Sequence, residues 1–72
     1  MYTKEQLLKQ LGRNIKAERV RKGYTQESFA EKLDVTREYI SRIERGQENM
    51  SITKILNIAN SLETDINNIL LF

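Results

Sequence analysis

The sequence contains no cysteine and no histidine among its 72 residues. Disulfide bonds and the usual zinc sites are therefore excluded, because their ligands are thiolate and imidazole groups. Catalysis by cysteine or histidine is excluded with them, and we expect no enzyme activity, no cofactor and no metal. No apolar run approaches the roughly 20 residues of a membrane span, and the N-terminus lacks the apolar region of a signal peptide. We therefore expect a cytoplasmic protein with no membrane partner.

The charged residues are unevenly distributed along the chain. Residues 1–45 contain 11 Lys and Arg against 7 Asp and Glu, whereas residues 46–72 contain one Lys against 3 acidic residues. A basic half indicates one face for a polyanion and leaves the acidic half for another contact. Chance asymmetry on a solvated surface would give the same counts. The length predicts one domain over residues 1–72, of a size that buries about 60% of its unfolded surface.

The segment 26–45, QESFAEKLDVTREYISRIER, predicts two short helices joined by a tight turn. Phe29, Ala30 and Leu33 share one face of the first helix, and Ile40 and Ile43 share one face of the second. The side chain at position 30 is small, so the two helices can cross closely. Two helices of this kind form a helix-turn-helix, in which the first turn of the second helix is presented to base edges.

A longer helix is expected before this pair, at residues 4–22. Thr3 and Gln6 have the spacing of a capping box at its start. Gly12 inside it is expected to permit close packing, and Gly23 is expected to end it in the left-handed conformation. The predicted apolar stripe of this helix comprises Leu7, Leu8, Leu11, Ile15 and Val20.

Two further helices are expected after the pair, which gives an all-α fold of five helices. Ser51 is expected to cap the fourth helix, and Thr64 or Asp65 the short fifth. Asp34 lies in the turn of the motif, where we expect a positive φ. The predicted core face of the fourth helix comprises Ile52, Ile55, Leu56, Ala59 and Leu62, with Ile58 off the stripe. The apolar residues of the fifth are Ile66, Ile69 and Leu70.

Over residues 11–72 the chain resembles the Cro and phage-repressor (XRE-like) helix-turn-helix proteins. The resemblance rests on the Arg-x-x-x-Gly spacing of Arg19 and Gly23, on the segment 25–27 (TQE) and on the segment 40–46 (ISRIERG). The segment TREYISRIERG, which is followed by ENMS, also resembles the corresponding segment of the controller proteins of restriction–modification systems.

This resemblance implies a compact, lambda-repressor-like domain that binds double-stranded DNA. It also implies an ion pair between Arg19 of the first helix and Glu44 at the end of the recognition helix, which would tie the two helices together. Two residues depart from the family pattern: Asp34 replaces the usual turn glycine, and Met50 stands where many members have proline.

Base contacts are expected from Arg37, Glu38 and Arg42. Arg37 is the strongest candidate, because a guanidinium can bridge guanine O6 and N7. Glu38 can accept from cytosine N4 or hold Arg37 in position. Glu38 could equally face solvent. Thr36 could serve only as the helix cap, and Tyr39 could only cover the rim of the core. The predicted contacts to the DNA backbone are Gln26, Thr36, Tyr39, Ser41 and Arg45.

A second copy of the chain is expected, because a body with a radius of gyration near 11 Å covers one major groove but not two grooves about 34 Å apart. The C-terminal segment is also more apolar than one short helix can hide. Alternatively, these residues seal the core of their own domain. The predicted dimer interface comprises Ile58, Ile66, Ile69, Leu70, Leu71 and Phe72.

The function predicted from these features is a homodimeric, sequence-specific transcription regulator that acts on a palindromic operator, with controller proteins as one candidate branch. We expect no domain for a small-molecule effector; a second protein, either a toxin or RNA polymerase, is the other candidate partner. The main alternative is an antitoxin that autoregulates its own operon. An enzyme and a purely structural nucleoid protein are weaker alternatives.

Overall fold

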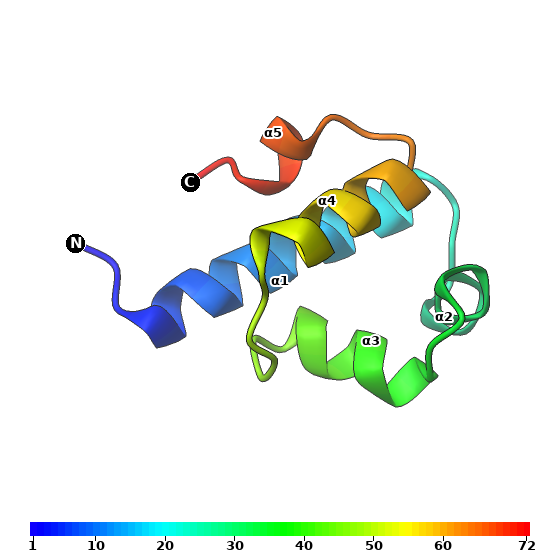
Figure 1. Ribbon diagram of the computed structural model, residues 1–72, viewed down its shortest axis with the longest axis horizontal. Coiled ribbons are helices and arrows are strands. Elements are labelled where there is room, and N and C mark those ends of the chain that lie inside the picture. The colour runs from blue at the N-terminus through cyan, green and yellow to red at the C-terminus, as the bar shows by residue number, and fades with distance from the viewer.

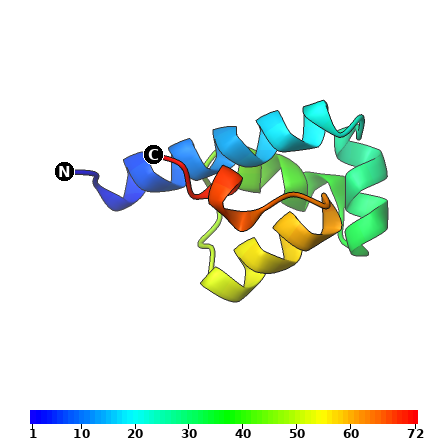
Figure 2. The same cartoon turned by 90° about the horizontal axis from the view of Figure 1, so that it is seen from above.

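Five α-helices make up the regular structure of the computed structural model, which describes residues 1–72 and confirms the predicted all-α fold. Figures 1 and 2 show that α5 covers the seam between α1 and α4, on the side away from α3. No helix is long and apolar enough to cross a membrane. The helices are α1 (Lys4–Arg21), α2 (Gln26–Leu33), α3 (Arg37–Glu44), α4 (Ile52–Ser61) and α5 (Ile66–Ile69).

Each helix begins at a side-chain cap that the sequence supplies. Thr3 and Gln6 form the predicted capping box of α1. At the other helix starts the cap accepts a hydrogen bond from a backbone N–H of the first turn, a contact that contributes about 0.5–2 kcal/mol per helix. Asp34 ends α2 with a φ of +58°, as predicted for the turn of the motif. The other four caps are Thr25, Thr36, Ser51 and Asp65.

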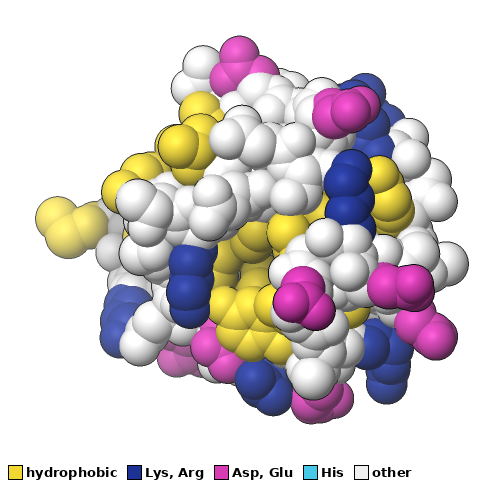
Figure 3. All heavy atoms as spheres, turned by 45° about the vertical axis from the view of Figure 1, so that its right-hand side comes forward, with side chains coloured by type: hydrophobic (Ala, Val, Ile, Leu, Met, Phe, Trp, Pro, Cys, Tyr) yellow, Lys and Arg dark blue, Asp and Glu magenta, His cyan; other side chains and the backbone are white.

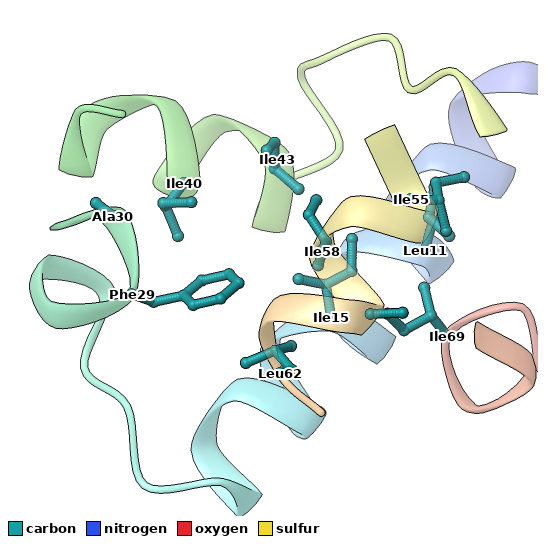
Figure 4. Packing of buried hydrophobic residues seen from close by; sticks show 11 residues of the cluster. Leu11, Ile15, Phe29, Ala30, Ile40, Ile43, Ile55, Ile58, Leu62 and Ile69 are labelled. Carbon is teal, nitrogen blue, oxygen red and sulfur yellow. The ribbon is translucent and has the colours of Figure 1, made fainter. Parts of the chain in front are cut away.

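The core lies where α1, α2, α3 and α4 meet, and α5 closes one side of it (Figure 4). Phe29 is fully buried and points from α2 toward the centre of the molecule. A buried side chain of this size contributes roughly 1.5–3 kcal/mol to stability. Phe29 and the aliphatic cluster around it therefore hold α2 and α3 against α1 and α4. The buried apolar residues are Leu11, Ile15, Phe29, Ala30, Ile40, Ile43, Ile55, Ile58, Ala59, Leu62 and Ile69.

The predicted face of α4 was wrong for part of the helix. Ile58 is 4% exposed and belongs to the core, whereas Ile52 and Leu56 are 61% and 44% exposed. Both sets of residues have helical spacing, so periodicity alone does not choose between them. The contact of α4 with α5 and α2 decides which face turns inward. On α1, Leu7 and Val20 are likewise exposed rather than part of the buried stripe.

The backbones of α1 and α3 almost touch at Gly12. A Cβ atom at this position would lie 2.5 Å from the carbonyl oxygen of Ile43 and 2.6 Å from that of Glu44. Any side chain would therefore push the two helices apart, which confirms that Gly12 is there for close packing. This contact sets how far α3 stands from α1.

The ion pair implied by the resemblance is present next to this contact. Arg19 Nε donates to Glu44 Oε2 at 2.7 Å and Arg19 Nη2 donates to Glu44 Oε1 at 3.2 Å. A third nitrogen, Nη1, donates to the carbonyl oxygen of Tyr24 at 2.7 Å. The two residues are only 6% and 8% exposed. The pair thus joins α1, α3 and the loop before α2 through charge-assisted bonds in a nearly dry site.

A second charged contact ties the end of α1 to the loop before α5. The carboxylate of Glu18 accepts from Arg21 Nε and Nη2, at 3.1 and 2.8 Å, and from the hydroxyl of Thr64. These donors lower the pKa of Glu18 from 4.5 to about 2. The carboxylate therefore stays charged well into the acid range and holds the connection between α4 and α5 in place.

We expect the substitution Glu44→Gln to lower the stability of the fold, because it leaves the charge of Arg19 buried without its counter-charge. Removal of one partner of a buried pair costs about 3–5 kcal/mol, which corresponds to a fall in Tm of more than about 10 °C in a domain of this size. Thermal unfolding followed by circular dichroism measures this. Glu5→Gln is the control, because the pair of Glu5 with Lys9 is exposed and contributes little. Equal melting of both variants and the wild type would contradict the role of the pair.

The low pKa of Glu18 leads to a separate prediction about how stability depends on pH. Because the pKa of Glu18 is depressed in the folded state, the charged carboxylate adds to the free energy of unfolding. This contribution is complete above pH 4.5 and is lost as the pH falls toward about 2. Glu18→Gln should therefore destabilise the protein by about 1–2 kcal/mol at pH 7, with the difference from wild type vanishing near pH 2. Denaturant titrations across this range test it. Parallel stability curves for the two proteins would mean that Glu18 does not carry this part of the acid dependence.

Candidate nucleic-acid interface

The second helix of the helix-turn-helix, α3, lies along an open edge of the molecule (Figure 1). Its inward side is formed by Ile40 and Ile43, which are buried together with the ion-paired Glu44. At about 100° per residue, Arg42 and Arg45 lie on the opposite side of the helix. The exposed side of α3 therefore carries polar and charged residues in the position that a recognition helix requires. The prediction placed eight contacts on this surface and at the start of α2.

Arg37 is exposed in the first turn of α3, at the end of a hydrogen-bonded chain. Its Nη1 donates to Gln26 Oε1 at 3.1 Å, and Gln26 Nε2 donates to Glu44 Oε1 at 3.0 Å. Glu44 is held in turn by Arg19 of α1. The guanidinium is thus oriented from the core outward through one nitrogen, while its other N–H groups remain available for a planar acceptor.

Gln26 lies at the N-terminus of α2, where the sequence placed it, but its amide is not free. Both the oxygen and the nitrogen of the amide take part in the chain to Arg37, and one N–H of the amide remains for another acceptor. The backbone N–H groups of the first turn of α2 also favour an anion here. The position therefore supports Arg37 and leaves one N–H group of the amide for an anion.

Glu38 and Arg45 lie one above the other on the exposed side of α3. Arg45 Nη2 donates to Glu38 Oε1 at 3.4 Å, and both side chains are more than half exposed. Glu38 does not contact Arg37, so the suggested bond between these two is absent and Gln26 takes that place. Thr36 caps α3 by accepting from the backbone N–H of Tyr39 at 3.1 Å, and its side chain is exposed at the leading end of the helix.

Arg42 faces outward but is held by the loop after α3. Its Nε donates to Glu48 Oε1 at 2.8 Å, and its guanidinium carbon lies 5.8 Å from the ring centroid of Tyr39. Lys54 of α4 lies over the same ring, with its Nζ 5.4 Å from the centroid. The proximity of Tyr39 is the largest cause of the raised pKa of Lys54, and the charge of Glu48 adds to it. Tyr39 thus packs on the rim of the core with two cations on its ring.

Two members of this cluster, Glu48 and Lys54, were not among the predicted site residues. Glu48 belongs to a polar loop without periodicity, so nothing in the sequence connects it with Arg42. Lys54 is the only basic residue after Arg45, which marks it as unusual but does not place it against α3. Only the path of the loop, where the backbone N–H of Gln47 donates to the carbonyl of Arg42 at 2.8 Å, brings them together.

A hollow of about 170 Å³ lies beside this cluster, between the ends of α2 and α3 and the side of α4. Figure 3 shows hydrophobic side chains at its floor and charged groups around it. The structure describes no group of three or more His, Cys, Asp and Glu that could hold a metal ion. The residues that line the hollow are Leu33, Val35, Tyr39, Lys54, Asn57 and Ile58.

The predicted dimer residues do not lie together on the surface. Ile58 and Ile69 are 4% and 0% exposed and pack in the core of their own chain, so they are not available to a second copy. Ile66 and Leu70 are half-buried against that core. Of the predicted interface residues, only Leu71 and Phe72 are exposed to solvent.

The end of the chain is nevertheless held in place. The amide nitrogen of Asn14 donates to the carbonyl oxygens of Ile69 and Leu71, both at 2.8 Å. The ring of Phe72 packs against that of Tyr2, with centroids 5.7 Å apart. The C-terminal segment therefore lies along α1 as an ordered surface.

Comparisons with known proteins agree with this arrangement. The helix-turn-helix family matches residues 15–69. The restriction–modification controller protein C.AhdI from Aeromonas hydrophila is 32% identical, covers 86% of this chain and 94% of its own, and superposes with a TM-score of 0.77. A variant of the controller protein C.Esp1396I is 34% identical, over 92% and 97% of the chains, with a TM-score of 0.75.

The clp gene regulator ClgR from C. glutamicum is 28% identical, over 90% of this chain and 83% of its own, with a TM-score of 0.85. The curated protein sequences gave no match. The family match covers the cap, turn and recognition helix described above as well as the core that holds them. The chain therefore belongs to the helix-turn-helix family of DNA-binding transcription regulators, of the Cro and phage-repressor (XRE-like) type.

Proposed function

We propose that the protein is a sequence-specific transcription regulator that places α3 in the major groove of its operator. The observation that supports this most is the chain from Arg19 through Glu44 and Gln26 to Arg37. It starts in the core and ends at an exposed guanidinium in the first turn of α3. A preorganised guanidinium loses little conformational freedom when it binds two acceptors in one plane, as guanine O6 and N7 provide.

The other polar residues of this surface suit the DNA backbone. The first turn of α2, with Gln26, flanks Arg37 along the same edge of the molecule, together with the exposed residues Thr36 and Arg45 and the half-buried Ser41. Contacts of this kind set the register of the protein on the duplex and carry most of the salt dependence, whereas contacts to base edges set the sequence. Glu38 meets the groove beside Arg45 and is the candidate acceptor for cytosine N4.

The size of the domain supports a homodimer on a palindromic operator. The radius of gyration is 11.1 Å and the longest dimension is 34 Å, so a single chain presents one α3 to one groove. Two copies related by a two-fold axis would present two such helices about one helical turn apart. The exposed apolar residues of the chain include Ile52 and Leu56 on α4 and Leu71 and Phe72 in the C-terminal segment, which we take as the candidate dimer surface.

The controller proteins of restriction–modification systems are the candidate branch for this regulator. Two solved structures with that description are 32% and 34% identical to this chain and match it over nearly their whole length. A regulator of this size responds to its own concentration if it binds as a dimer, because occupancy then rises with the square of the monomer concentration at low levels. No feature of the surface specifically favours the antitoxin alternative, which co-purification with a second chain would support.

Selection of bound duplexes from a random pool, at a stated salt concentration, tests the proposed specificity. We expect a palindromic motif, and we expect Arg37→Ala to relax one base position in each half-site at a cost of about 1–3 kcal/mol. Gln26→Ala should weaken binding to all sequences and should also relax the Arg37 position in part, because it removes the support of that side chain. Lys4→Ala, at the end of α1 that lies away from the loop into α2, is the control for loss of one positive charge. An equal loss on every sequence for Arg37→Ala would make Arg37 a backbone contact.

Sedimentation equilibrium tests the proposed dimer surface. Removal of Leu71 and Phe72, and separately Leu56→Glu, should weaken self-association at least tenfold while the monomer stays folded, since all three side chains are exposed. Val20→Glu is the matched control, because Val20 is also an exposed apolar residue and lies on α1. A dimer that tolerates both changes would show that copies of the chain meet through another surface.

A further inference from the structure

The two arginines of α3, Arg37 and Arg42, and its C-cap Arg45 are all bound by acceptors of the same chain. Arg37 is held by the neutral amide oxygen of Gln26, whereas Arg42 and Arg45 are held by carboxylates. The carboxylate oxygen is chemically close to the phosphate oxygen that these arginines would meet on DNA. The acidic partners therefore occupy the groups that would otherwise bind any duplex, whatever its sequence.

The contact of Arg42 with Glu48 is the stronger of the two acidic contacts. Its N–O distance is 2.8 Å, against 3.4 Å for Arg45 with Glu38. The side chains of Arg42 and Glu48 are 38% and 25% exposed, so water screens them less than it screens the other pair, whose side chains are more than half exposed. Tyr39 also covers one side of the guanidinium.

The position of Glu48 is set by the backbone rather than by α3 itself. The loop turns back at Gly46, which has a φ of +75°, and is closed by the hydrogen bond from the N–H of Gln47 to the carbonyl of Arg42. Glu48 thereby faces Arg42 on the side of α3 that is turned outward. A phosphate that binds Arg42 through Nε must therefore displace this carboxylate.

We propose that Glu48 competes with DNA for Arg42 and thereby reduces binding to unrelated sequences more than binding to the operator. This inference rests on the proposed function. Affinity for unrelated DNA comes almost entirely from neutralised phosphates. Loss of one arginine contact therefore weakens it directly, whereas base contacts from Arg37 sustain the operator complex. Glu48 is thus a specificity-determining residue that makes no contact with a base.

The test compares wild type with Glu48→Gln on the selected operator and on a scrambled duplex of the same length, over a series of salt concentrations. We expect the variant to bind the scrambled duplex about three- to tenfold more tightly, with a log–log salt slope steeper by about 1, as one more phosphate contact requires. Affinity for the operator should change by less than twofold. The ratio of operator affinity to scrambled affinity should therefore fall.

Two further variants show whether the effect is local. Glu63→Gln removes the same charge from the loop before α5, away from α3 (Figure 1), and should leave the affinity ratio unchanged. In an Arg42→Gln background, Glu48→Gln should give no further gain, because the competition acts through Arg42. Circular dichroism establishes that each variant is folded.

The outcomes separate the two proposals. A wild-type protein with no preference for any duplex would overturn the proposed function. The Glu48 inference would still be tested by the scrambled duplex and by the NMR signal of Arg42 Nε–H, which should exchange with water faster in the variant than in wild type. If Glu48→Gln weakens both complexes, Glu48 positions Arg42 for DNA instead, and the inference is wrong. Behaviour identical to that of Glu63→Gln would also overturn it.

Discussion

The close approach of α1 and α3 is the constraint on which the rest of the structure depends. Gly12 lets the two backbones meet, and the pair of Arg19 with Glu44 fastens them beside that contact. The same carboxylate of Glu44 orients Gln26, and through it Arg37. A single buried group therefore serves both the fold and the exposed surface, so that the direction of the Arg37 guanidinium is defined relative to the core rather than by α3 alone.

The charges on the outer side of α3 are arranged by their partners as much as by their number. Arg37 is supported by a neutral amide, and its charge remains uncompensated. Arg42 and Arg45 each lie against a carboxylate, so their charges are largely balanced in the free protein. Arg37 can therefore bind a further acceptor directly. Arg42 and Arg45 must first release a carboxylate before they bind another acceptor. A net charge of +2 for the chain conveys none of this.

Local rules in the sequence predicted much of the fold. The caps at Thr3 and Ser51 and the left-handed turn at Asp34 were predicted correctly, because each depends on a few neighbouring residues. The inward face of α4 was not, since Ile52 and Ile58 both fit a helical stripe and the choice depends on where other helices pack. For the site, the position of Arg37 followed from the motif, but its partner Gln26 and the carboxylate beside Arg42 required the three-dimensional path of the chain.

Asn14 shows how the C-terminal segment can be ordered without depending on its own side chains. The amide of Asn14 binds the main-chain oxygens of Ile69 and Leu71, atoms that every amino acid possesses. The path of the last residues along α1 is therefore compatible with many sequences at those positions. The side chains at these positions can therefore be replaced, and the apolar character of this surface altered, while the anchor itself remains intact.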